Sequence, residues 1–140
     1  MGAAICEQQR HSPFATHYLP SFMTAEIIAI GSELLTPHRT DTNSLFLTEQ
    51  LNAIGVDVTY KTIVGDDRAR LTETMILAWN RSGLVITIGG LGPTEDDLTR
   101  ECAAAALGKL LLKDGSLAEL IESRFRARGI RMPEINLRQA

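Results

Sequence analysis

Apolar and polar positions alternate with two distinct periods from Met23 to the end of the chain. Short apolar runs predict strands over residues 26–30 and 84–88, and an apolar–polar alternation predicts another over 56–64. Apolar residues spaced by three or four predict helices, each ending close to a glycine, over residues 43–54, 67–81, 94–107 and 116–128. This alternation of strands and helices predicts an α/β fold, a three-layer α/β/α arrangement around a mostly parallel sheet.

Local signals sharpen several of these elements. The strand over 84–88 is apolar throughout, which predicts a central strand with both faces covered. Ser116 and Glu119 form a capping-box pattern at the start of the last helix. Asn43 suits the N-cap of the first helix and equally suits contact with a ligand. The residues expected to face inward are Leu47, Leu51 and Ile54 on the first helix and Leu71, Met75 and Ala78 on the second.

The composition fits one globular domain. The chain has 140 residues, of which 44% are hydrophobic and 22% are charged, and this suits a core of ordinary size. Residues 1–22 lack periodicity and contain two helix-breaking prolines, so we interpret them as a flexible extension before a domain over 23–140. Cys6 and Cys102 lack the spacing of a metal site, and Cys102 lies in an apolar run typical of a core position.

The charge balance limits the kinds of partner. There are 14 Lys and Arg against 17 Asp and Glu, a net charge of −3, which argues against binding to a nucleic-acid backbone. The sequence holds no run of about 18 apolar residues, which predicts no membrane span, and its first residues do not have the pattern of a signal peptide. We therefore expect a cytoplasmic protein whose partner is a small molecule.

Candidate chemistry gathers where the strands are expected to end. Ligands of parallel α/β sheets bind outside the carboxyl ends of the strands, here residues 31–42, 65–67 and 89–97. The last segment is a glycine-rich loop whose backbone amides and following helix N-terminus suit a phosphate group. Its candidate phosphate-binding residues are Gly89, Gly90, Leu91, Gly92, Pro93 and Thr94. The alternative is a tight turn with Thr94 as the helix N-cap.

Acidic residues accompany all three segments. Carboxylates beside a phosphate site usually act through a divalent cation or on a proton. We hypothesise that Glu33, Asp66 and Asp97 are catalytic, and that Asp66 and Asp97 bind a divalent metal or position a nucleophilic water. We interpret Asp67 and Glu95 as helix caps. Further candidates for ligand contact are Gly31 and Ser32 in the first segment and Asn43 directly after it.

Three separated motifs, Met23–Leu35, Val64–Asp67 and Gly89–Thr99, occur in order. Together they resemble the N-terminal domain of the CinA (competence/damage-inducible) family, within the wider MoaB/MogA-like molybdopterin-binding fold. The resemblance implies a nucleotide or pterin phosphate held by Gly89–Thr94, with functional aspartates at Asp66 and Asp97. It also implies hydrolysis of ADP-ribose, or a similar nucleoside diphosphate sugar, to AMP and ribose 5-phosphate with Mg²⁺ or Co²⁺ as cofactor. A homo-oligomer is expected because domains of this fold commonly associate.

The chain departs from the family pattern at two places. Residues 36–41 are more polar than is usual, which leaves the substrate preference open. The family domain continues into further strands beyond Asn136–Ala140, so we expect the fold to be truncated at its C-terminus. Two alternatives stand beside the metal-dependent pyrophosphatase. One is a non-catalytic module that binds a nucleotide or molybdopterin, and the other is a catalytically inactive assembly module.

Overall fold

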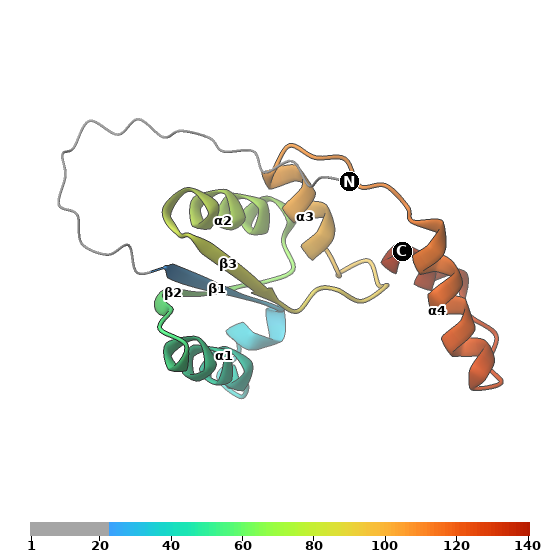
Figure 1. Cartoon of the computed structure of the whole chain (residues 1–140), viewed down its shortest axis with the longest axis horizontal. Helices are drawn as coiled ribbons and strands as arrows, with labels where there is room; N and C mark the ends of the chain where they lie inside the picture. Colours follow the sequence, from blue (N-terminus) through green and yellow to red (C-terminus); the bar gives the residue numbers. More distant parts are fainter. Residues whose placement is uncertain (1–22) are drawn as a thin grey trace.

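The computed structural model describes residues 23–140, which fold around a three-stranded parallel sheet (Figure 1). The strands are β1 (Thr24–Ile30), β2 (Asp57–Val64) and β3 (Leu84–Ile88), in the order β2-β1-β3. The extension predicted over residues 1–22 lies outside the described residues, and so does Cys6.

Helices lie on both faces of this sheet. Their bounds are α1 (Thr42–Ala53), α2 (Arg68–Arg81) and α3 (Thr99–Ala106), with a 3₁₀ helix η1 (Ser32–Leu35) after β1. Figure 1 shows α1 on one face and α2 and α3 on the other, which confirms the predicted α/β/α layers. Beyond them come α4 (Gly115–Ala127), which buries none of its residues, and a second 3₁₀ helix, η2 (Glu134–Gln139). No helix within residues 23–140 combines the length and apolar character needed to cross a bilayer.

The core consists of two apolar clusters, one on each face of β1. Successive side chains of a strand point to opposite faces, so Ile28 and Ile30 pack toward α2 and α3 while Ala25 and Ile27 pack toward α1. The first cluster contains the three predicted inward residues of α2 and also Cys102, as expected. On α1, Leu51 is buried and Leu47 packs against the second cluster. The prediction for Ile54 is wrong: its side chain is 74% exposed, because α1 ends at Ala53.

The central strand is β1 and not the 84–88 strand. β1 pairs with β2 and β3 at once, so that Ile28 lies opposite Thr62 on one side and Thr87 on the other. β3 pairs only with β1 within the described residues, and all five of its residues are half-buried. An apolar run indicates that both faces of a strand are packed against other elements. It does not indicate whether the strand has hydrogen-bonded neighbours on one side or on both.

Aspartates begin three of the four α-helices. Asp41 accepts a hydrogen bond from the amide of Ser44 at 2.9 Å, so Asp41 is the N-cap of α1 and Asn43 is an exposed residue of the first turn. Asp67 caps α2 as predicted, with 2.8 Å to the amide of Arg70. The capping-box interpretation of α4 is wrong, because Asp114 receives the bonds from Ser116 and Leu117.

Replacement of Asp41 by alanine should lower the free energy of unfolding by about 1 kcal/mol, since the first turn of α1 loses its acceptor. Asn43→Ala is the matched control and should change stability by less than about 0.5 kcal/mol. Urea unfolding followed by circular dichroism measures both. Equal losses in the two variants would contradict the assignment of Asp41 as the cap.

A buried ion pair lies at the amino end of β1. The Glu26 side chain is fully buried and accepts hydrogen bonds from Arg81 at 2.8 Å (Nε) and 2.6 Å (Nη2). Thr62 and Ser82 donate further hydrogen bonds to the same carboxylate. The Arg81 guanidinium also lies 3.8 Å from the centre of the Tyr60 ring. Every oxygen of this buried carboxylate therefore has a partner, which is the condition under which a charge is tolerated in a core.

Candidate functional site

The carboxyl ends of β1 and β3 form a topological switch point, where the chain connections of neighbouring strands leave the sheet in opposite directions. The connection from β1 to β2 passes through α1 on one face, and that from β2 to β3 passes through α2 on the other (Figure 1). Open α/β sheets bind their ligands at such a switch point. The segments that leave it are residues 31–35 and 89–98, and we call them the switch-point edge. They contain most of the residues predicted to contact a ligand.

The two segments begin in direct contact. Gly89 has a φ of +96°, and a Cβ added there would collide with the carbonyl oxygen of Ile30. Only glycine accommodates both this backbone conformation and this close approach. On the other side of β1, the amide of Gly31 donates to the carbonyl of Val64 at 3.0 Å. The ends of the three strands are thereby joined at one place.

Ser32 and Asp66, both predicted site residues, are brought together by reciprocal hydrogen bonds. The amide of Ser32 donates to Asp66 Oδ2 at 2.8 Å, and the amide of Asp66 donates to Ser32 Oγ at 3.0 Å. Glu33 follows directly, and its carboxylate lies over Gly31, where a Cβ would be 2.6 Å from Glu33 Oε2. Asp66 and Glu33 therefore both contact the start of the segment after β1, one through Ser32 and the other over Gly31.

Asp97, at the end of the glycine-rich loop, accepts hydrogen bonds from the residues before it. Its carboxylate accepts hydrogen bonds from the amides of Gly92 and Thr94, each at 2.8 Å, and from the Thr94 hydroxyl. The Thr94 hydroxyl, followed by these two amides, holds the pKa of Asp97 below its ordinary value. The two amides already have an anionic acceptor, so they are not open to a phosphate while Asp97 keeps this position.

The helix after this loop starts later than predicted. α3 begins at Thr99, with Leu98 at its N-cap position, so Thr94 and Glu95 do not cap it. The prediction that a helix N-terminus opens directly onto the glycines is therefore wrong. Among the described residues, the amides of Gly90 and Leu91 donate to no protein acceptor, and these two remain available to an anion.

The carbonyl side of the loop is held by residues that sequence reasoning missed. Arg100 donates to the carbonyl of Leu91 at 2.7 Å and to that of Gly92 at 3.0 Å. Arg138, from η2, donates to the carbonyls of Pro93 and Thr94. The Arg100 contacts are local enough to suspect from its position in the first turn of α3. Arg138 lies more than 40 residues from its partners along the sequence, and no sequence pattern predicts these contacts.

The predicted metal ligands do not form a ready-made metal centre. Within residues 23–140, no three His, Cys, Asp or Glu side chains lie close enough together to hold an ion. Asp66 Oδ2 and both oxygens of Asp97 already accept hydrogen bonds. The donor set at the switch-point edge is thus too small to fit a divalent cation by itself.

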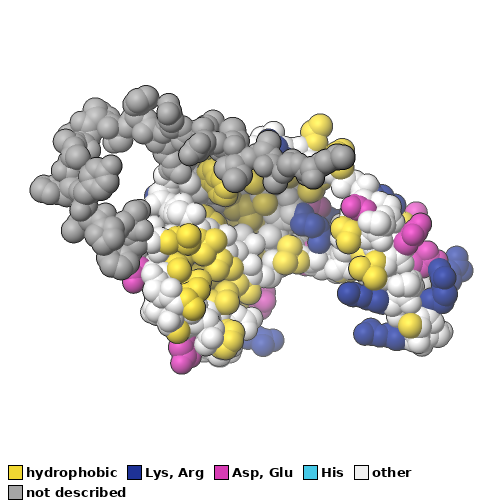
Figure 2. All heavy atoms as spheres, in the orientation of Figure 1, with side chains coloured by type: hydrophobic (Ala, Val, Ile, Leu, Met, Phe, Trp, Pro, Cys, Tyr) yellow, Lys and Arg dark blue, Asp and Glu magenta, His cyan; other side chains and the backbone are white. Residues whose placement is uncertain are grey.

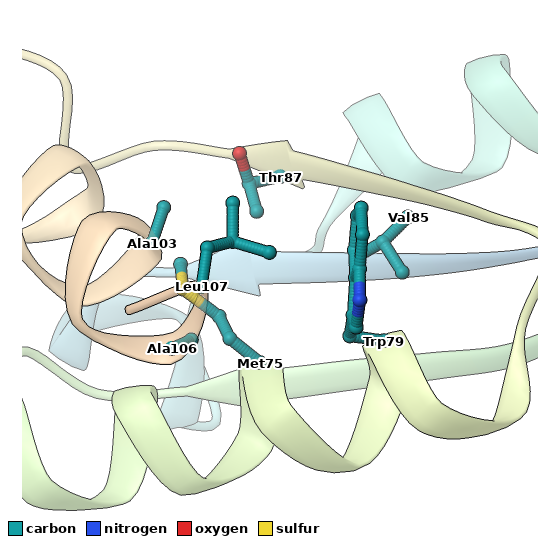
Figure 3. A pocket seen from close by; sticks show the side chains of 7 residues that line it. All are labelled: Met75, Trp79, Val85, Thr87, Ala103, Ala106 and Leu107. Carbon is teal, nitrogen blue, oxygen red and sulfur yellow. The ribbon is translucent and has the colours of Figure 1, made fainter. Parts of the chain in front are cut away.

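Two cavities lie near the sheet, and they differ in chemistry. One, of about 200 Å³, lies between α2, β3 and α3 and is lined by Met75, Trp79, Val85, Thr87, Ala103, Ala106 and Leu107 (Figure 3). It presents no charged group. The other, of about 410 Å³, adjoins the switch-point edge through Leu35 and has both Arg70 and Glu73 in its lining. Only the second combines apolar surface with charged groups, an arrangement that suits a polar ring compound.

Comparison with known proteins agrees with this geometry. The sequence model of the family described as "Probable molybdopterin binding domain" matches residues 26–138. The chain therefore belongs to the molybdopterin-binding domain family.

Two of the similar curated proteins are named CinA-like. The chain is 56% identical over 118 residues to a CinA-like protein of Koribacter versatilis and 54% identical to one of Solibacter usitatus. Each match covers 84% of this chain, which spans 28% of the length of those curated relatives. These matches confirm the resemblance predicted from the three motifs.

Solved structures confirm the fold. CinA of Thermoplasma acidophilum, whose function is unknown, superposes with a TM-score of 0.75 at 30% identity, covering 82% of this chain and 67% of that one. The molybdopterin biosynthesis enzyme MoaB of Thermus thermophilus superposes with a TM-score of 0.55 at 25% identity, covering 82% and 70%. The predicted MoaB/MogA-like architecture is correct.

Proposed function

We propose that this domain binds a small phosphorylated molecule, a pterin or a nucleotide, at the switch-point edge. The observation that carries the proposal is the contact between the segments after β1 and β3, fixed by Gly89 against Ile30, at the place where open α/β sheets bind ligands. Membership in the molybdopterin-binding domain family supports the same ligand class.

The groups at this edge suit a ligand with an anionic end and a hydrogen-bond-donating end. The amides of Gly90 and Leu91 are the donors for phosphate oxygens. The carboxylate of Glu33 would repel a phosphate but accept hydrogen bonds from ribose hydroxyls or from the amino group of a pterin. The neighbouring cavity, with Leu35 and Arg70, has the size of a site for a ring system.

Calorimetric titration with AMP and with ADP-ribose tests this proposal. We expect both to bind, and we expect Glu33→Gln to weaken the binding of ADP-ribose roughly tenfold, because a hydrogen bond to a charged acceptor is lost. Glu119→Gln, an exposed acid on α4 away from this cavity, is the matched control and should leave the affinity unchanged. If neither AMP, ADP-ribose nor a molybdopterin precursor binds the parent protein, the proposal is wrong.

Hydrolysis of the bound ligand is the second candidate function. The observation that favours it is that two carboxylates, Glu33 and Asp66, both contact the start of the segment after β1. A binding module for phosphates gains nothing from acids there unless they contact other groups of the ligand. The residues present do not fit a divalent cation, so we assign no step to a metal.

An assay of ADP-ribose with and without Mg²⁺ or Co²⁺, in which AMP is followed by chromatography, separates the two functions. Metal-dependent AMP that disappears in Asp97→Asn would support a metal-dependent pyrophosphatase. Binding of ADP-ribose without AMP formation would leave the domain as a binding module.

We include self-association in the proposed function. Figure 2 shows hydrophobic side chains gathered on the part of the surface where Figure 1 places α1. The α1 residues Leu45 and Phe46 are 54% and 60% exposed. Exposed apolar surface of this kind supports the predicted homo-oligomer. Native mass spectrometry measures the number of chains directly.

A further inference from the structure

One guanidinium group joins the C-terminal segment to the glycine-rich loop. Arg138 Nη1 donates to the carbonyls of Pro93 at 3.2 Å and Thr94 at 2.5 Å, while its Nη2 donates to Glu101 Oε1 at 3.1 Å. Next to it, the side-chain amide of Gln139 donates to the carbonyl of Leu91 at 3.2 Å. The planar fork of arginine presents donors on two separate nitrogens to acceptors in different directions, whereas the three donors of lysine all lie on one nitrogen.

Glu101 depends on this contact. Its Oε2 atom is buried and has no hydrogen-bond partner among the described residues, so the carboxylate is satisfied only through Oε1. Glu101 lies on α3, directly after Arg100, whose guanidinium holds the carbonyls of Leu91 and Gly92. Glu101 thereby ties Arg138 to the same helix that positions the other half of the loop.

The two arginines together hold four consecutive carbonyl groups, those of residues 91–94. A loop whose carbonyls are fixed on one side has its amides fixed as well, because each peptide unit is planar. The peptide units that the arginines hold carry the amides of Gly92 and Thr94, which donate to Asp97, and the amides of Gly90 and Leu91, which are available to an anion, come directly before them. The stretch that directly follows the available donors is thus held by side chains that do not touch the ligand themselves.

We propose that Arg138, anchored by Glu101, is a positioning residue that holds the 91–94 loop, and through it the adjoining amides of Gly90 and Leu91, in the conformation that binds phosphate. This inference rests on the proposed function, since it concerns the same loop. Removal of Arg138 should loosen the loop even when no ligand is present, and it should weaken any ligand that uses the loop amides.

The test compares Arg138→Gln with Arg131→Gln. Both variants lose one positive charge from the same C-terminal segment, but Arg131 is exposed and has no hydrogen bond to another described residue. Hydrogen exchange of the Gly92 and Thr94 amides in the ligand-free protein should become roughly tenfold faster in Arg138→Gln and stay unchanged in Arg131→Gln. Affinity for ADP-ribose should fall roughly tenfold in the first variant only.

Two further variants distinguish a positioning role of Arg138 from a general loss of stability of the domain. Arg138→Lys retains one donor for the Thr94 carbonyl and should give intermediate exchange and affinity. Glu101→Gln keeps the acceptor but removes its charge, and it should shift both readouts in the same direction as Arg138→Gln, with a smaller effect. Thermal unfolding of each variant shows whether the whole domain is affected.

Unchanged exchange in Arg138→Gln relative to Arg131→Gln would overturn the inference. Faster exchange with unaltered affinity in a parent protein that binds ADP-ribose would overturn it too, because the loop would then be held but not used. If the parent protein binds no ligand, the proposed function fails at that step, and so does the role of Arg138 in binding. The exchange readout then decides only whether Arg138 holds the loop.

Discussion

Replacement of Gly89 by alanine should abolish ligand binding and lower the free energy of unfolding by about 3 kcal/mol. The new Cβ would collide with the carbonyl oxygen of Ile30, and this atom belongs to the central strand and cannot move aside. The φ of +96° adds backbone strain. Urea unfolding and titration with ADP-ribose measure the two effects.

Gly108→Ala is the matched control for this substitution. Gly108 also has a positive φ, of +62°, but an added Cβ would meet no atom within 4 Å. Gly108→Ala should therefore lower the free energy of unfolding by about 1 kcal/mol, through backbone strain alone, and should leave ligand binding unchanged. Equal losses of stability in the two variants would show that the contact between Gly89 and Ile30 has no energetic importance.

Replacement of Glu26 by glutamine should lower the free energy of unfolding by about 3 kcal/mol at neutral pH. The neutral amide would place a donor against the guanidinium of Arg81 and remove the charge that compensates it. Asp57→Asn, an exposed acid on β2, is the control and should have little effect. A Glu26→Gln variant as stable as the parent at pH 7 would be evidence against this account.

We expect the effect of Glu26→Gln on the free energy of unfolding to depend on pH. Burial alone would raise the pKa of Glu26, but hydrogen bonds from Arg81, Thr62 and Ser82 outweigh it and hold the pKa below the ordinary value of 4.5. A carboxyl whose pKa is lower in the folded state stabilises the fold above its unfolded pKa and loses that contribution as the pH falls through the folded value. The difference in stability between parent and Glu26→Gln should therefore shrink below about pH 4.5.

The fold was predictable because its signals are local and repeated. The periodicity of α2, with Leu71, Met75 and Ala78, and the apolar run of β1 appear directly in the structure. The errors occur where two neighbouring residues compete for one role. Asp41 and Asn43 are both good caps, and the winner is decided by which side chain reaches the amide of Ser44. That distance depends on the path of the preceding loop, which sequence patterns do not specify.

The sequence predicts which residues lie at the candidate site, but it does not predict the hydrogen bonds between them. The sequence places Ser32, Asp66 and Asp97 at strand ends, and the structure adds that Asp97 is bonded to its own loop. The ion pair of Glu26 could have been suspected, because a charge inside an apolar strand requires a partner. The role of Arg138 could not, because it depends on how the last segment returns to the loop.

The bonds around the 91–97 loop have a consequence for the thermodynamics of recognition. Asp97, Arg100 and Arg138 fix this loop before any ligand arrives. Its conformational entropy has then already been lost on folding, so association with a ligand does not have to order it. We expect a preorganised site, in which free and bound backbones superpose and the rate of association is set by diffusion and desolvation rather than by a rearrangement of the loop.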